Sequence, residues 1–198
     1  RDPVEGAYSA EEVGLALNNA SLPLEALRYD LTPVGLHYTL SHFDIPALEA
    51  AAFRLKVGAR EVSLAELQSL PQKTVRVTLE CAGNGRALFR PRLPGVQWKR
   101  GAMGNARWTG VRLSQLLARA KPKGGSWVRL QGLDKPLLTA PPFVRAIPLE
   151  KALHPDTLVA LSMNDAPLAP LHGFPARLVT PGWVGDDWVK WLSDVKLL

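Results

Sequence analysis

The stretch TVRVTLECAGNGR, residues 74–86, joins a strand pattern to a loop pattern around Cys81, the one cysteine of the chain. Apolar and polar residues alternate from Thr74 to Cys81, which predicts a half-buried β-strand. The GNG run at 83–85 is typical of a loop. Cys81 therefore stands where a strand ends, a position from which its side chain can face a cleft.

Other short strands are expected along the chain, separated by turns that contain proline. Alternating or apolar runs predict strands at residues 53–57, 127–130, 157–161 and 177–180, and residues 189–198 are expected to close the sheet. Such a set of short strands, with 17 prolines among 198 residues, favours a β-rich fold of the α+β class.

Helices are expected to be few and short. Capping-box patterns predict one helix over residues 9–17 and another over residues 63–71. The spacing of apolar residues predicts an amphipathic helix over residues 108–120, and a turn is expected at residues 106–110.

The composition, 46% hydrophobic and 21% charged, is that of a folded globular protein. The sequence contains no run of 18 apolar residues, so no membrane span is predicted. A single cysteine excludes an intrachain disulfide framework and a multi-cysteine zinc site. We assign residues 1–38 to a peripheral N-terminal segment and residues 39–198 to one compact domain.

Positive charge is concentrated in one part of the chain. Residues 81–133 contain eleven Lys and Arg residues and no Asp or Glu, whereas the remainder has 13 basic and 18 acidic residues. This excess indicates a binding site for an anion, or else a solvated basic surface. Nucleic acid is a third candidate partner, but no zinc-finger, RNA-recognition or zipper pattern is present.

Cys81 and several later residues are the candidates for chemistry. Basic neighbours lower the pKa of a thiol, and a soft metal binds the thiolate form. The alternative for Cys81 is a small buried hydrophobic residue. Other segments place an imidazole or a cation at the edge of a strand or turn, and cationic donors suit the phosphate of a cofactor. These segments are Ser41-His42, residues 106–110, His172 to Arg177, and Trp188 to Trp191 with Lys190.

A series of motifs begins at Cys81 and continues to the end of the chain. In chain order they are LECAGNGR (79–86), VQWKRGA (96–102), NARWTGV (105–111), AIPL (146–149), LSMNDAPL (161–168), HGFPAR (172–177), TPG (180–182) and VKWL (189–192). Their order resembles that of the sulfite oxidase family of molybdenum enzymes. The resemblance extends over residues 39–198.

The resemblance implies a mixed fold that buries one molybdopterin, with the Cys81 thiolate bound to molybdenum. It implies that the cofactor is also held by His42, Asn84, Arg107, His172, Arg177 and Lys190. Arg86 and Trp98 would line the substrate pocket, so that the catalytic residues would be Cys81, Arg86 and Trp98. The reaction implied is oxygen-atom transfer to or from a small sulfur compound, with sulfite oxidised by an external electron acceptor. The basic stretch would then surround the cofactor phosphate.

The chain departs from the sulfite-oxidising pattern at three positions. Leu40 stands where those members have an arginine, Phe143 where they have a tyrosine, and Asp187 where many members have a basic residue. Loss of an arginine removes a charge-assisted hydrogen bond to an oxyanion, typically worth ~1.5–3 kcal/mol. We therefore keep two alternatives open: reduction of an S- or N-oxide on the same cofactor, and a non-catalytic anion-binding or interaction module that retains the fold.

Partners and location are expected from the same resemblance. The chain has no Cys-x-x-Cys-His motif, so no haem is expected, and electrons would pass to or from a separate protein such as a cytochrome. The sequence stops at Leu198, before the dimerisation domain of the family, which favours a monomer. A periplasmic or otherwise exported location is expected, as for bacterial relatives.

Overall fold

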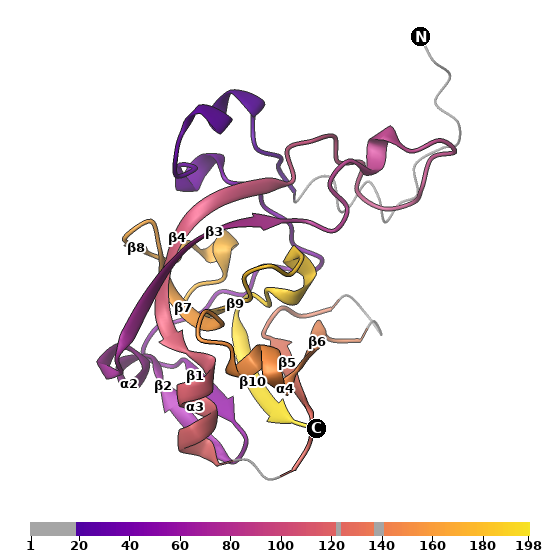
Figure 1. Ribbon diagram of the computed structural model, residues 1–198. Helices are drawn as coiled ribbons and strands as arrows, with labels where there is room; N and C mark the ends of the chain where they lie inside the picture. Colours follow the sequence, from indigo (N-terminus) through magenta and orange to yellow (C-terminus); the bar gives the residue numbers. More distant parts are fainter. Residues whose placement is uncertain (1–18, 122–123, 137–140) are drawn as a thin grey trace.

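The computed structural model describes residues 19–121, 124–136 and 141–198. Within these residues the strands form two five-stranded sheets, with short helices at their margins (Figure 1). This mixed, β-rich architecture confirms the predicted α+β fold class. The helix predicted over residues 9–17 lies outside the described residues.

The first sheet pairs the first strand of the sequence with the last. In order of pairing, its strands are β2 (Arg60–Ser63), β1 (Arg54–Val57), β10 (Leu192–Leu197), β5 (Trp127–Gly132) and β6 (Val144–Pro148). β1 and β10 run parallel, and the other neighbours are antiparallel. The last strand in the sequence therefore lies in the middle of a sheet, between β1 and β5, with neighbours on both sides.

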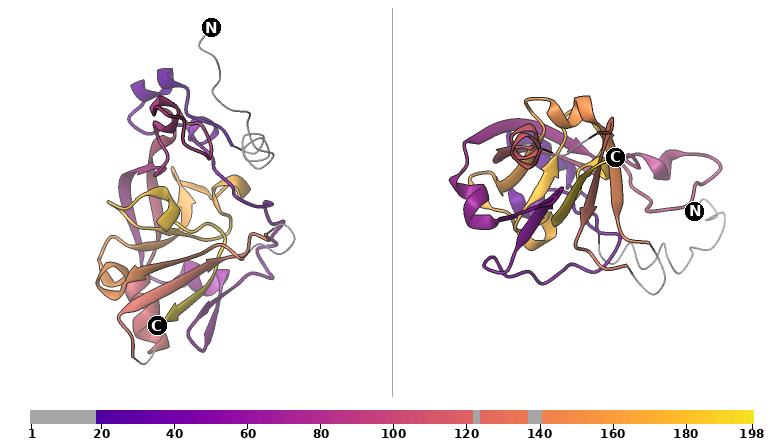
Figure 2. Two further views of the ribbon diagram at one scale, coloured as in Figure 1. Left: turned by 90° about the vertical axis from the view of Figure 1, so that its right-hand side faces the viewer. Right: turned by 90° about the horizontal axis from the view of Figure 1, so that it is seen from below.

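The second sheet contains the long hairpin that carries Cys81. Its strands are β3 (Gln72–Glu80), β4 (Met103–Arg112), β7 (Leu158–Met163), β8 (Ala166–Pro167) and β9 (Arg177–Val179). All pairs are antiparallel, and β4 lies between β3 and β7. The loop between β3 and β4 projects from the body in two different views (Figures 1 and 2).

The prediction for residues 106–120 was wrong in its first part. Residues 106–112 form neither a turn nor a helix but the second half of β4, and helix α3 begins only at Leu113 and ends at Ala120. Burial alternates along β4, with Ala106 and Trp108 fully buried. Because β4 pairs with a strand on each side, sheet hydrogen bonding outweighs the helical spacing of its apolar residues.

Other elements match the sequence patterns. β1 alternates exposed and buried residues as predicted. Helix α2 (Leu64–Ser69) opens with the predicted capping box, in which Ser63 Oγ accepts from the backbone N–H of Glu66 at 3.2 Å. The remaining helical segments are α4 (Leu149–Leu153) and the 3₁₀ turns η1 (Leu24–Arg28), η2 (Val34–Leu36), η3 (Arg86–Leu88), η4 (Pro170–His172) and η5 (Gly185–Asp187).

Two clusters of buried side chains form the core. One, with Leu55, Leu113 and Leu130, joins the first sheet and helix α3 to residues of the second sheet such as Val159. The other includes the indole rings of Trp108 and Trp188 and belongs to the second sheet. Cys81 and Trp98 belong to the second cluster, so the end of β3 is anchored in apolar surroundings.

Candidate functional site

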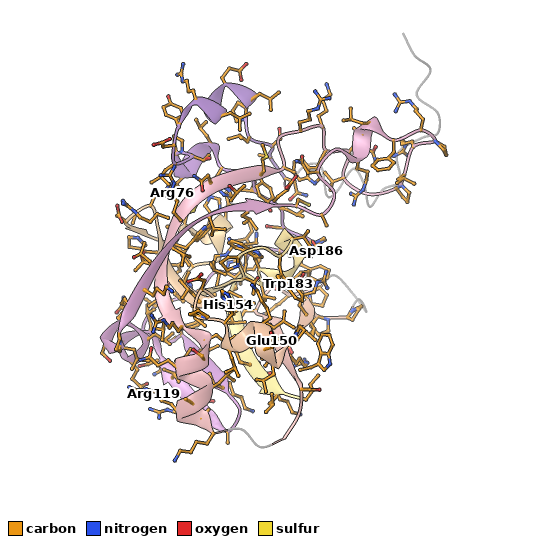
Figure 3. All side chains as sticks on the ribbon, viewed as in Figure 1. Arg76, Arg119, Glu150, His154, Trp183 and Asp186 are labelled. Carbon is orange, nitrogen blue, oxygen red and sulfur yellow. The ribbon has the colours of Figure 1, made fainter. Side chains whose placement is uncertain are left out.

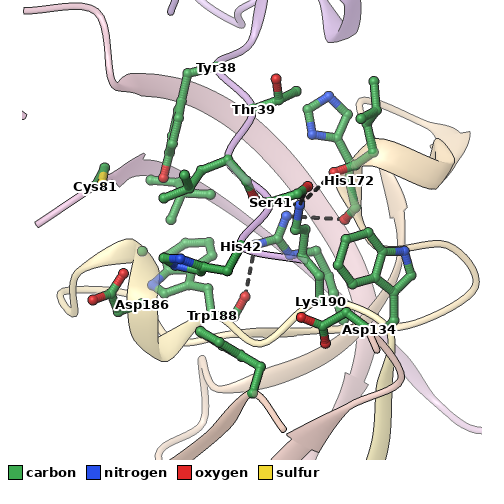
Figure 4. A pocket seen from close by; sticks show the side chains of 17 residues that line it. Tyr38, Thr39, Ser41, His42, Cys81, Asp134, His172, Asp186, Trp188 and Lys190 are labelled. Atoms are coloured by element: carbon green, nitrogen blue, oxygen red, sulfur yellow. Dashed lines mark hydrogen bonds between the residues drawn. The ribbon is translucent and has the colours of Figure 1, made fainter. Parts of the chain in front are cut away.

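A pocket beside the end of β3 is lined by segments that lie far apart in the sequence (Figure 4). They come from the extended chain after η2, the end of β3, the loops on either side of the undescribed residues 137–140, η4, β9 and the η5 turn. We call it the central pocket. Its lining residues are Tyr38, Thr39, Leu40, Ser41, His42, Leu79, Cys81, Asp134, Phe143, Leu171, His172, Arg177, Gly185, Asp186, Trp188, Lys190 and Trp191.

Cys81 supplies the sulfur of this pocket. Its backbone N–H donates to the carbonyl of Ala102 at 2.9 Å, which fixes the residue at the end of the hairpin. Its Sγ accepts a hydrogen bond from the backbone N–H of Gly83 at 3.4 Å. Burial raises the pKa of the thiol, and the positive charge of Arg86 lowers it only in part. This corrects the expectation that basic neighbours dominate: in the protein alone, burial favours the thiol.

Arg177 is a buried cation at the pocket wall. Its side chain is 3% exposed, and its two terminal nitrogens donate to the carbonyls of His172 and Trp188, both at 3.1 Å. Burial lowers its pKa to about 10. Among the residues that the structure describes, no carboxylate lies within ion-pair distance of its guanidinium.

Lys190 is a second cation of the pocket, and it is partly buried. Its Nζ donates to the Leu40 carbonyl at 2.7 Å, to Ser41 Oγ at 2.9 Å and to the Leu171 carbonyl at 3.0 Å (Figure 4). These oxygens are all neutral. Burial, aided by the positive charge of Arg177, lowers the pKa of Lys190 to about 7. Two cations thus face one pocket, and this favours an anionic ligand that would raise both pKa values.

Asp134, which sequence reasoning missed, lines the same pocket. It is 6% exposed, and its Oδ1 has no hydrogen-bond partner among the described residues. Burial raises the pKa of this carboxyl, while Lys190 lowers it. One signal could have identified Asp134, because it is the first acidic residue after Glu80 and ends the acid-free stretch.

His172 has a second, unpredicted histidine behind it. The Nε2 of His172 lies 3.2 Å from the Val34 carbonyl, and its ring meets that of His37 edge to face at 5.4 Å. Burial, aided by His37, lowers the pKa of His172 to about 3, and burial lowers that of His37 to about 4. Both rings are therefore neutral at pH 7. No local sequence pattern distinguishes His37, because its low pKa results from burial against β4, a strand far from it in the sequence.

The structure brings five of the predicted residues into the pocket and leaves four outside it. His42, Cys81, His172, Arg177 and Lys190 all line it. The remaining predicted residues, Asn84, Arg86, Trp98 and Arg107, are not among its lining residues.

Asn84 and Trp98 lie close to Cys81 but support the loop. The side chain of Asn84 accepts from the backbone N–H of Ala102 at 3.1 Å and donates to Glu80 at 2.8 Å, which ties the loop to both strands. Trp98 is 5% exposed and packs edge to face on Tyr38, and its side-chain hydrogen bonding contributes to lowering the pKa of Cys81.

Arg86 and Arg107 have other partners. The Arg86 guanidinium donates to the Val96 carbonyl at 3.0 Å and lies where a Cβ on Gly83 or Gly95 would be. Arg107 pairs with Asp165 on the exposed side of β4. Neither guanidinium lines the pocket.

The basic stretch does not surround the central pocket. None of its eleven Lys and Arg residues is among the described lining residues, and the positive charge there comes from Arg177 and Lys190 instead. Figure 3 shows one of the eleven, Arg119 on α3, near the bottom of the view and well below Asp186. The expectation that this stretch surrounds the cofactor phosphate stays a prediction, and the lining of the pocket that contains Cys81 does not add to it.

The donor set of the pocket suits an organic anion that carries a soft metal. It offers one sulfur, two cationic donors and one carboxylate with a free acceptor oxygen. Among the described residues, no group of three or more His, Cys, Asp or Glu side chains is placed to hold a metal ion by itself. A metal here would need most of its ligands from a cofactor.

Within the described residues, no helix has the length and apolar character needed to cross a membrane.

Comparisons with known proteins agree with this chemistry. The family model "oxidoreductase molybdopterin binding domain" matches residues 42–198. Sulfite oxidase of Gallus gallus is 42% identical over 194 residues, which cover 89% of this chain and 42% of that protein. The NADH nitrate reductase of Ulva prolifera is 34% identical over 178 residues, covering 82% of this chain and 21% of the reductase.

A solved structure extends the likeness to the fold. The crystal structure of the sulfane dehydrogenase SoxCD from Paracoccus pantotrophus superposes with a TM-score of 0.78 and 29% sequence identity, covering 99% of this chain and 54% of that one. The chain thus spans well under two thirds of each protein that it resembles. With its family model, its relatives and its fold in agreement, the chain belongs to the sulfite oxidase family as a molybdopterin-binding oxidoreductase domain.

Proposed function

We propose that this domain catalyses oxygen-atom transfer to or from a small sulfur compound, with the molybdenum cofactor bound in the central pocket. For sulfite the overall reaction is sulfite + water → sulfate + 2 H⁺ + 2 electrons, and a separate electron-transfer protein such as a cytochrome accepts the electrons one at a time. The observation that carries the proposal is the presence of one thiol, the buried Arg177 and the partly buried Lys190 in a single pocket.

The residues of the pocket fit this cofactor. When bound, the cofactor supplies a metal centre that transfers one oxygen atom and two electrons. The Cys81 thiolate would bind the molybdenum, because a soft metal prefers sulfur and raises the acidity of a coordinating thiol. Arg177 and Lys190 would bind the phosphate, and Asp134 would accept from an N–H group of the pterin.

The remaining walls of the pocket exclude water and orient the ligand. His172, kept neutral by burial, offers one ring nitrogen and holds the other near the carbonyl of Val34. His42 stacks on Phe143 with ring centroids 5.4 Å apart. Asn84, Arg86, Trp98 and Arg107 stay candidates from the family motifs. In the structure, Asn84 and Trp98 act as positioning residues for the loop that carries Cys81.

A second candidate reaction is the reduction of an S- or N-oxide on the same cofactor. Leu40 and Phe143, which replace the arginine and tyrosine expected in sulfite-oxidising members, both line the central pocket. An apolar wall of this kind suits a neutral substrate better than an oxyanion.

We also propose that the domain is monomeric.

The first test is the metal content of protein from a host that makes the cofactor. We expect near-stoichiometric molybdenum by elemental analysis, whereas a non-catalytic module would contain none. Cys81→Ser should lose turnover by more than about a hundredfold, beyond the range for changes outside the metal ligands. Normal turnover of Cys81→Ser, or protein free of molybdenum, would contradict the proposal.

A further inference from the structure

Four side chains are linked by a series of contacts beside the central pocket, and three of them, His42, Phe143 and Asp186, line it. The His42 ring stacks on Phe143 at an interplanar angle of 18°. The Arg145 guanidinium lies over the same Phe143 ring, 4.4 Å from its centre. Arg145 Nη2 then pairs with Asp186 Oδ2 at 3.6 Å. A carboxylate is thus held in place by a cation that is itself fixed on an aromatic ring.

Asp186 lies at the same end of the pocket as Cys81. Both residues line it, and Figure 4 shows them together on one side, with Asp134, Lys190 and His172 on the other. Lys190 therefore lies at one end of the pocket together with Asp134, whose pKa is raised by burial, and the Asp186 carboxylate lies at the end where the metal would bind.

The other charges near this end do not cancel the carboxylate. Arg145 pairs with Asp186 only at the partly exposed rim, where the side chains are 34% and 36% exposed. Asp187 follows on the same turn, and burial raises its pKa. Arg86 is the cation on the far side of Cys81, and its guanidinium is tied to the Val96 carbonyl. Leu79 and Phe143 add apolar lining, and the polar groups of Tyr38 and His42 also lie at this end, neither of them a cation that pairs with Asp186 (Figure 4).

We propose that Asp186, positioned by Arg145, is a specificity-determining residue that makes the reactive end of the pocket favour sulfur compounds without net negative charge over oxyanions. A dianion such as sulfite meets a like charge there, whereas a thioether or sulfoxide does not. For a thioether the balanced reaction is R₂S + water → R₂SO + 2 H⁺ + 2 electrons, with the electrons passed to the separate carrier. This inference rests on the proposed function.

The test compares two variants on the same turn, Asp186→Asn and Asp187→Asn, in the molybdenum-loaded enzyme. Each removes one negative charge, but only Asp186 lines the pocket. We expect Asp186→Asn to raise kcat/KM for sulfite about five- to tenfold, the scale of one charge removed from a partly screened site. In Asp186→Asn, turnover of dimethyl sulfoxide with an artificial electron donor should change by less than about twofold. In Asp187→Asn, neither kcat/KM for sulfite nor turnover of dimethyl sulfoxide should change by more than about twofold.

Removal of the cation should act in the opposite direction. Arg145→Gln leaves the carboxylate without its partner, so kcat/KM for sulfite should fall about fivefold. The double variant Arg145→Gln/Asp186→Asn should recover to at least the wild-type value. If the double variant stays as low as Arg145→Gln, the arginine acts by holding these side chains together and the charge proposal is wrong.

Equilibrium binding of inorganic sulfate gives a readout independent of turnover. Calorimetric titration of the same holoproteins should show tighter sulfate binding by Asp186→Asn than by the wild type, with Asp187→Asn unchanged. Equal effects of the two variants on sulfate binding and on sulfite kcat/KM would overturn the inference while leaving the proposed function intact. Absence of molybdenum from every variant would instead remove the proposed function itself.

Discussion

Lys190 shows how a single residue can report on the ligand of a pocket. Its ammonium group donates to three neutral oxygens and lies in the field of a second cation, the buried Arg177. A lysine in such a place is poorly stabilised by the protein alone, and its pKa falls to about 7. A phosphate beside it would restore the charged form, so ligand binding and proton binding are coupled at this residue.

The stability of the apo-protein should therefore depend on pH through Lys190. Between pH 7 and about 10.5 the lysine is less protonated in the folded chain than in the unfolded one, so unfolding takes up a proton. The free energy of unfolding should rise with pH across this window. Urea titrations at several pH values should show that this rise is much smaller in Lys190→Met, and an unchanged pH dependence would contradict it.

The same substitution should weaken retention of the cofactor. Lys190→Met removes one cationic donor from the proposed phosphate site, and we expect the bound molybdopterin to fall at least about tenfold after dialysis. Lys151→Met is the matched control, because Lys151 is also partly buried and donates to a carbonyl, that of Pro181, but lies outside the pocket. Equal loss in both variants would show that the effect is not specific to the pocket.

Sequence reasoning identified side chains whose identity carries the chemistry and missed those whose chemistry depends on burial. Cys81, His172 and Lys190 stand in recognisable motifs, and the structure places all three in the pocket. Asp134 and His37 have no such motif, because only the packing around them makes their charge or ring unusual. Long arginines are the hardest to place from sequence, since the guanidinium can fold back onto backbone carbonyls, as that of Arg86 does.

At the scale of elements, β4 shows why a correct apolar pattern can give the wrong structure. The strand and helix α3 follow each other without a break, so apolar residues at 108–117 fit a helical spacing as well as a strand. What decides between them is the pairing of β4 with β7, a strand about fifty residues later. The capping box before α2, in contrast, is a local signal, and the helix begins where that signal predicts.

Gly110 lies where the backbones of β4 and β7 approach closely. A Cβ there would lie 2.1 Å from the Val159 carbonyl oxygen, and the strand register shifts between Thr109 and Gly110. Backbone cannot move aside as a side chain can. We therefore expect Gly110→Ala to lower the free energy of unfolding by about 3 kcal/mol, as overpacking in a core does.

The control for this change is Gly35→Ala, because a Cβ at Gly35 would meet nothing within 4 Å. Its effect on the free energy of unfolding should stay within about 0.5 kcal/mol. Chemical denaturation of both variants measures the difference. If the two substitutions had the same effect, the contact between β4 and β7 would not be as tight as described.

At the scale of the whole molecule, the central position of β10 predicts where the fold is most resistant to opening. This strand pairs with β1 on one side and β5 on the other, although it is the last element of the sequence. Hydrogen exchange followed by mass spectrometry should find residues 192–197 among the slowest to exchange, and the edge strands β2 and β8 among the fastest. Rapid exchange along β10 would contradict this arrangement.

The pairing of β1 with β10 also has a consequence for biosynthesis. The lining of the central pocket begins at Tyr38 and ends at Trp191, and the strand beside Trp191 completes the first sheet. During translation, neither the complete first sheet nor the complete pocket can form until the last segments of the chain have been synthesised. For a cofactor bound in the central pocket, as proposed, insertion would follow translation of this domain, and a ribosome stalled before Trp191 would carry a nascent chain without the complete pocket.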